Sequence, residues 1–211
     1  LDEAEARYNQ AILLKPGYAE AYINLGNILR ELNKPEDASN AYTQAIALKP
    51  NHAGVHFNLG APLTDLGKLE EALDRYKQAI ALEPNYAEAH FQLGNTFKEL
   101  EMLDEAELSY NQAISSKADF AEAYCNLGVI FSEREKFDDA LESYRQAIAL
   151  QPNYTKALFN LGVTISSVEF SSSKPELYPA LVELLTNKNL IRPKDLARNI
   201  LSLLKHDPLM K

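Results

Sequence analysis

Apolar residues recur at helical spacing along most of this 211-residue chain. Between residues 19 and 32 they stand three or four positions apart, which places them on one side of a helix. A short polar turn follows, and residues 35–48 repeat the pattern with Ala38, Tyr42 and Ala45 on one side. The pattern therefore predicts two helices joined by a short turn.

This pair of helices recurs with a period of 34 residues. The period is carried by Gly26, Gly60, Gly94, Gly128 and Gly162, by Ala4, Ala38, Ala72, Ala106 and Ala140, and by Tyr8, Tyr42, Tyr76, Tyr110 and Tyr144. The glycine and alanine let the two helices approach closely, and we expect the tyrosine to pack beside them. One such pair cannot bury its apolar face alone, so the period predicts an all-α stack of repeats.

Together with prolines that follow the second helices, these positions resemble the tetratricopeptide repeat. The resemblance implies a right-handed α-solenoid of 34-residue helix-turn-helix repeats, with the first helices lining a concave face. We expect the array to cover residues 1–168. Its parts are a half repeat at 1–18, full repeats at 19–52, 53–86, 87–120 and 121–154, and a first helix at 155–168.

The period fails after Val168, so we treat residues 169–211 separately. One helix is expected over Pro175–Thr186 and another opens at Pro193, with a turn before it and Pro208 at its end. We expect these two non-repeat helices to form a C-terminal cap or a linker. The helix at residues 1–14 has no such cover, so we expect further repeats or an intermolecular contact at that end.

An amide precedes Leu-Gly in every first helix. The five residues are Asn24, Asn58, Gln92, Asn126 and Asn160. The position is rotated by about 100° from the core leucine that follows it, toward the concave side. Because a carboxamide both donates and accepts hydrogen bonds, a ladder of amides can bind the main chain of an extended peptide. Asn27 and Asn95 would widen this polar strip.

The ladder, with repeats such as AYINLG at residues 21–26, resembles the superhelix of O-linked N-acetylglucosamine transferases. That resemblance implies that the amides hold the backbone of a protein substrate. A structural alternative is that each amide bonds a neighbouring turn and stabilises stacking. The residues just before the ladder are Ile23, Phe57, Phe91, Cys125 and Phe159, which would form an apolar wall of the groove or belong to the core.

Charge narrows the choice of partner. The net charge of -9 disfavours nucleic acid and anionic membranes and favours neutral or basic peptides. A carboxylate clamp for acidic tails needs basic residues on the first helices, where only Lys156 starts a helix with a positive charge. The sequence has no apolar run long enough to cross a membrane and only one cysteine, so we expect a cytoplasmic protein.

No phosphate loop, metal cluster or nucleophile motif occurs, so we expect no enzymatic activity and no cofactor in this chain. His52 and His56 are four residues apart, but His56 takes a core position, which argues against a metal site. Pro62 stands inside an expected helix, where proline removes a hydrogen bond. We predict a peptide-binding interaction module. The alternatives are the substrate-recruiting or oligomerising region of a larger transferase, with its catalytic domain after Lys211, and a scaffold that forms homo-oligomers through the solenoid ends.

Overall fold

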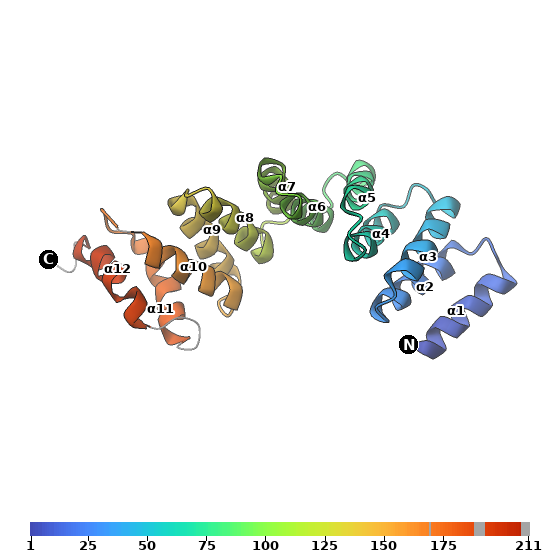
Figure 1. The fold of residues 1–211 in the computed structure, drawn as a ribbon, viewed down its shortest axis with the longest axis horizontal. Helices are drawn as coiled ribbons and strands as arrows, with labels where there is room; N and C mark the ends of the chain where they lie inside the picture. Colours follow the sequence, from blue (N-terminus) through green and yellow to red (C-terminus); the bar gives the residue numbers. More distant parts are fainter. Residues whose placement is uncertain (169, 188–192, 208–211) are drawn as a thin grey trace. The chain divides into compact units, whose positions relative to one another are not determined.

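The computed structural model of the protein describes residues 1–168, 170–187 and 193–207, and these residues form helices and turns without a strand (Figure 1). The chain divides into two compact units, Leu1–Ser116 and Lys117–Lys211. The prediction of an all-α fold is confirmed for the described residues.

The first unit holds seven helices among its residues. They are α1 (Asp2–Leu14), α2 (Ala19–Glu31), α3 (Pro35–Leu48), α4 (Ala53–Asp65), α5 (Leu69–Leu82), α6 (Ala87–Glu99) and α7 (Leu103–Ser116). The described part of the second unit contains α8 (Ala121–Glu133), α9 (Phe137–Leu150), α10 (Thr155–Ser167), the 3-10 turn η1 (Pro175–Leu177), α11 (Tyr178–Thr186) and α12 (Pro193–Lys205). Within each unit, a helix packs antiparallel against the helices that precede and follow it, as α4 does with α3 and α5.

The turn inside each repeat is closed by one residue in the left-handed conformation. These residues are Asn33, Gly67, Glu101 and Glu135, with φ between 57 and 70. Glycine and asparagine adopt this conformation readily, whereas the two glutamates are strained there. The next amide N–H bonds the carbonyl five residues back, as Lys34 does with Leu29 at 2.9 Å, and this satisfies a carbonyl at the helix end.

The predicted contact between small residues and tyrosine is confirmed in four repeats. A Cβ atom added to Gly60 would lie 2.3 Å from Cε1 of Tyr76, and the glycines of the other repeats are similarly tight. Tyr42, Tyr76, Tyr110 and Tyr144 are all fully buried. The glycine is therefore required by close approach, since even a methyl group would overlap the ring.

Pro62 does not end its helix, because α4 runs from Ala53 to Asp65. The ring is buried, and the carbonyl of Asn58 loses the N–H donor that any other residue at position 62 would provide. Packing of α4 between α3 and α5 keeps the helix continuous.

The non-repeat helices α11 and α12 pack against α10. Asn199 Nδ2 donates to the carbonyls of Ile165 at 2.8 Å and Val168 at 2.7 Å, which satisfies the end of α10. The helix expected over Pro175–Thr186 begins as the 3-10 turn η1 and becomes α-helical at Tyr178. The predicted start at Pro193 is confirmed, while residues 188–192 of the expected turn and Pro208 lie outside the described residues.

Candidate functional site: the first-helix faces

The first helices of neighbouring repeats contact one another within each unit, as α2 does with α4 and α8 does with α10. We name the surface formed by α2, α4 and α6 the first-helix face of the first unit. The corresponding surface of α8 and α10 is the first-helix face of the second unit. The predicted ladder residues therefore fall into two sets, Asn24, Asn58 and Gln92 on one unit and Asn126 and Asn160 on the other.

The amides of the first unit are accessible and oriented. Asn24 is exposed, and Asn58 and Gln92 are half-buried. Asn58 Nδ2 donates to Asn27 Oδ1 at 3.3 Å, which leaves the Asn58 carbonyl oxygen as an acceptor. Gln92 Oε1 accepts from Asn95 Nδ2 at 3.0 Å, which leaves the Gln92 NH₂ group as a donor. The face thus presents one acceptor and one donor, the pair that a peptide main chain complements.

Asn27 and Asn95 also have a structural role that the sequence analysis missed. Asn27 Oδ1 accepts a hydrogen bond from the buried Tyr42 hydroxyl at 2.7 Å, and Asn95 Oδ1 accepts one from Tyr110 at 2.8 Å. Each asparagine lies 15 residues before its tyrosine, and this spacing is the signal that could have revealed the pair. The two asparagines therefore connect the polar strip to the core.

The repeats without this asparagine use a hydroxyl group instead. Ala61 replaces it in one repeat, and there the Tyr76 hydroxyl bonds Thr64. In the second unit, Ser132 Oγ lies 3.2 Å from the Tyr144 hydroxyl. Burial raises the pKa of Tyr76, and raises the pKa of Tyr144 to about 12, so both hydroxyls stay protonated at neutral pH.

The face of the second unit differs from that of the first. Asn126 is buried, and its Oδ1 accepts a hydrogen bond from Lys156 Nζ at 2.8 Å. Asn160 is half-buried. The structure thus places a lysine against a ladder amide, a contact that the sequence analysis did not foresee. Lys156 lies 30 residues after Asn126, on the next first helix.

The predicted apolar wall is divided between core and surface. Phe57 is half-buried, with its ring 4.9 Å from that of Tyr86, and Phe91 packs 5.8 Å from Tyr110. Ile23 is also half-buried and Cys125 is buried. Phe159 is 48% exposed. Of these wall residues, Phe159 is therefore the one presented most openly to a ligand.

Among the residues described, no group of three or more His, Cys, Asp or Glu side chains could hold a metal ion. His56 is buried and its Nε2 donates to the carbonyl of Pro50 at 2.8 Å, so its role is in the helix packing. No helix in the described part of the chain has the length and hydrophobicity needed to cross a membrane.

The helix-turn-helix repeats and their conserved spacing define a class, the α-helical repeat proteins. Within it, residues 19–52 and 121–154 match the family described as tetratricopeptide repeat, as do residues 87–120, and residues 63–101 match a TPR repeat. The matches together cover more than half of the chain. The chain therefore belongs to the tetratricopeptide-repeat (TPR) proteins. No curated protein matches it.

Solved structures share the fold. A crystal structure of MamA is 25% identical, with a TM-score of 0.70, over 74% of this chain and 91% of that chain. MamA from residue 41 to its end, from Desulfovibrio magneticus RS-1, is 20% identical, with a TM-score of 0.68, over 84% and 97% of the two chains. YrrB, described as a TPR protein with an unusual peptide-binding site, is 23% identical, with a TM-score of 0.66, over 93% and 98%.

Proposed function

We propose that the protein binds an extended segment of another protein on the first-helix face of the first unit, mainly through the main chain of that segment. The observation that carries the proposal is the orientation of two amides. Asn58 presents an acceptor and Gln92 a donor, while exposed Asn24 extends the same register on α2. Interactions with the main chain tolerate many side chains in the ligand.

The spacing of the repeats suits an extended ligand. Neighbouring packed helices lie roughly 10 Å apart, and an extended chain rises about 3.3 Å per residue. Each repeat would therefore follow about three residues of the peptide. Every third amide or carbonyl of the segment would meet a ladder residue.

The proposal agrees with two likenesses. The ladder resembles that of O-linked N-acetylglucosamine transferases, where it holds the backbone of a protein substrate. YrrB, with the same fold, is described as having an unusual peptide-binding site. The net charge of -9 favours a neutral or basic segment. On the second unit, we propose that Asn126 and Asn160 serve the same ligand class, with Phe159 receiving an apolar side chain.

The test is capture of peptides from a random 12-residue library by the wild-type chain and by two triple variants. The first variant is Asn24→Ala, Asn58→Ala and Gln92→Ala. The matched control is Asn51→Ala, Asn85→Ala and Asn111→Ala, which removes three exposed amides from loops and from a second helix. We expect broad capture by wild type and control, and loss in the ladder variant. Equal capture by all three chains would contradict the proposal.

Self-association is a second candidate function, which α1 favours. In α3, α5, α7 and α9 the periodic tyrosine is fully buried, whereas α1 contains no buried residue and its Tyr8 is half-buried. We propose that Ala4, Tyr8 and Ala11 meet a second copy of the chain. Light scattering that gives a monomer mass at all concentrations would contradict this.

A further inference from the structure

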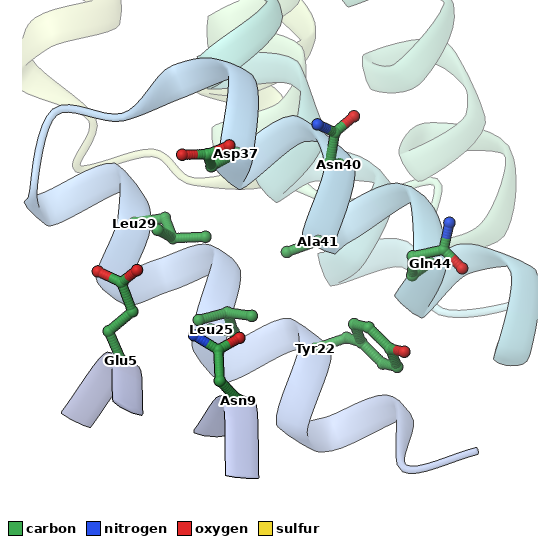
Figure 2. A pocket seen from close by; sticks show the side chains of 9 residues that line it. All are labelled: Glu5, Asn9, Tyr22, Leu25, Leu29, Asp37, Asn40, Ala41 and Gln44. Carbon is green, nitrogen blue, oxygen red and sulfur yellow. The ribbon is translucent and has the colours of Figure 1, made fainter. Parts of the chain in front are cut away.

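A pocket of about 370 Å³ opens between α1, α2 and α3 in the first unit (Figure 2). Its floor is apolar and is formed by Tyr22, Leu25 and Leu29 of α2. The neighbouring second helices α1 and α3 supply its walls. None of the ladder residues lines it, so this pocket is separate from the peptide site proposed above.

The walls carry acidic and amide groups. Glu5 and Asn9 come from α1, and Asp37, Asn40 and Gln44 come from α3. Glu5 is paired with Lys34 at the rim, with 2.9 Å between Oε2 and Nζ. Within the part of the chain that the structure describes, Asp37 forms no ion pair and the three amides make no side-chain hydrogen bond. These groups are therefore available to a ligand, and no basic residue lines the pocket.

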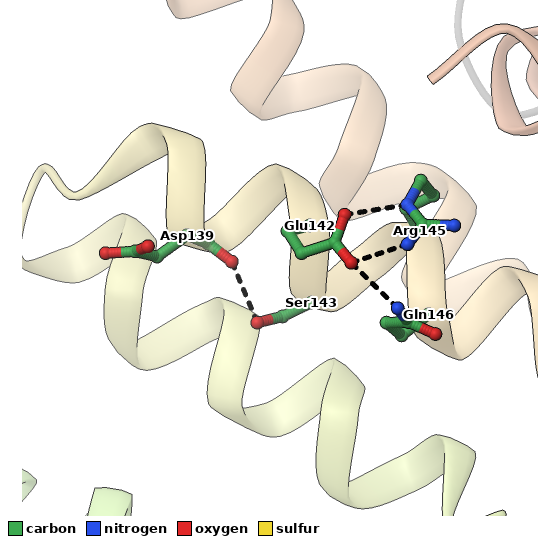
Figure 3. Close-up of polar contacts among 5 residues, drawn as sticks. All are labelled: Asp139, Glu142, Ser143, Arg145 and Gln146. Carbon is green, nitrogen blue, oxygen red and sulfur yellow. Dashed lines mark hydrogen bonds and ion pairs between the residues drawn. The ribbon is translucent and has the colours of Figure 1, made fainter. Parts of the chain in front are cut away.

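The chain contains an internal precedent for the ligand of such groups. The positions of Asp37, Asn40, Ala41 and Gln44 recur on α9, 102 residues later, as Asp139, Glu142, Ser143 and Gln146. There the chain supplies its own cation, Arg145 (Figure 3). Its Nε and Nη2 donate to the two Glu142 carboxylate oxygens at 2.7 and 2.5 Å, and Gln146 Nε2 donates to the same carboxylate at 2.7 Å.

On α3 the corresponding cation is missing. Thr43 stands where α9 has Arg145. One repeat further along, Arg75 stands where α3 has Ala41, and its side chain is half-buried. The small side chain of Ala41 is thus one reason why space remains over the floor. Two related helices therefore carry an arginine close to this position, while the α3 site has acidic groups, amides and an empty volume.

We propose that this pocket binds an arginine side chain of a partner protein. The guanidinium group carries donors in a planar fork that suits the Asp37 carboxylate and the amide oxygens of Asn40 and Gln44. Its aliphatic stem would cover Leu25 and Leu29. Lysine offers the charge without the fork, and the net charge of -9 attracts either cation.

The test is an NMR titration of the full chain with Gly-Ser peptides that carry one central arginine, citrulline or lysine. Citrulline keeps the shape of arginine and lacks its charge. We expect the arginine peptide to shift the side-chain amide signals of Asn9, Asn40 and Gln44, the lysine peptide to bind more weakly, and citrulline to have no effect. Equal binding of arginine and citrulline, or no shift with arginine, would overturn the proposal.

Two variants test the location. Asp37→Asn should weaken arginine binding about fivefold, the upper range for an exposed ion pair. Ala41→Arg should abolish it, because it fills the pocket as Arg75 does in the next repeat. Glu71→Gln, at the Asp37 position of α5, is the matched control and should change nothing. Thermal melting verifies that each variant folds.

The ladder variant separates this site from the first-helix face. The chain with Asn24→Ala, Asn58→Ala and Gln92→Ala should bind the arginine peptide like the wild type. If the peptide instead shifts the ladder amides, or if Asp37→Asn and Ala41→Arg leave the affinity unchanged, arginine is not bound in the pocket and the proposal fails.

Discussion

Each buried tyrosine brings a hydroxyl group into the core, and the repeats satisfy it in different ways. Tyr42 and Tyr110 use an asparagine that also borders the ladder, whereas Tyr76 and Tyr144 use a hydroxyl residue. A buried hydroxyl without a partner is costly. Asn27 is therefore fixed by the core on one side and in contact with Asn58 on the other.

We predict that Asn27→Ala lowers the free energy of unfolding by about 1–3 kcal/mol, because the Tyr42 hydroxyl loses its acceptor. Tyr42→Phe removes the hydroxyl that needs this acceptor. The double variant should therefore be more stable than the sum of the two single effects predicts. Urea unfolding of the wild type and the three variants measures this cycle, and additive effects would show that the hydrogen bond has no energetic role.

The tyrosines also predict how stability depends on pH. Burial raises the pKa of Tyr144 from 10.0 to about 12. Because the raised pKa favours the neutral form in the folded state, its stabilisation is complete below pH 10 and is lost as pH rises toward 12. The melting temperature should fall in this range, together with the rise of tyrosinate absorbance. Tyr144→Phe should reduce the fall, and an identical pH profile in that variant would contradict the assignment.

At the scale of the helix, the repeats differ most at Pro62. The same register position is Ile28 in α2 and Ile130 in α8, where the amide N–H can bond within the helix. Proline at this site is held by the packing of α3 and α5. An interior proline costs about 3 kcal/mol, so α4 is a helix that tolerates a defect.

We expect Pro62→Ile to raise the free energy of unfolding by about 1–3 kcal/mol, since it restores the hydrogen bond to the Asn58 carbonyl with a side chain that two other repeats accept. Chemical unfolding measures the stability, and hydrogen exchange at residue 62 detects the new bond. Ile130→Val, a mild core change in α8, is a control that should lose about 1 kcal/mol. A loss of stability in Pro62→Ile would mean that the proline ring has a packing role.

The helices themselves could be predicted from the sequence. The period located α3 at Pro35–Leu48 and placed α2 within one residue of its end. The 3-10 start of η1 could not be predicted, because it depends on contacts after the period fails. The side-chain partners were also hidden, since the bonds of Lys156 with Asn126 and of Asn199 with Ile165 join residues 30 and 34 positions apart. Periodicity predicts which face a residue occupies, but not the atom that it contacts.

At the scale of the molecule, the two units offer different first-helix faces. The first presents Asn24, Asn58 and Gln92 at an accessible surface. The second has Asn126 buried against Lys156 and Phe159 exposed. We therefore expect main-chain binding to depend more on the first unit. The second unit should add preference for an apolar side chain.

The central claim is that the amides of the first unit bind the main chain of a peptide. The most direct measurement compares a peptide selected from the library with analogues in which single amide bonds are replaced by esters, which lack the N–H donor. Fluorescence anisotropy gives each dissociation constant. If the account is right, esters near every third residue weaken binding about three- to tenfold, as expected for one hydrogen bond, and alanine at the same positions has little effect. If all esters bind like the parent while side-chain changes abolish binding, the ligand is recognised by its side chains and the claim is wrong.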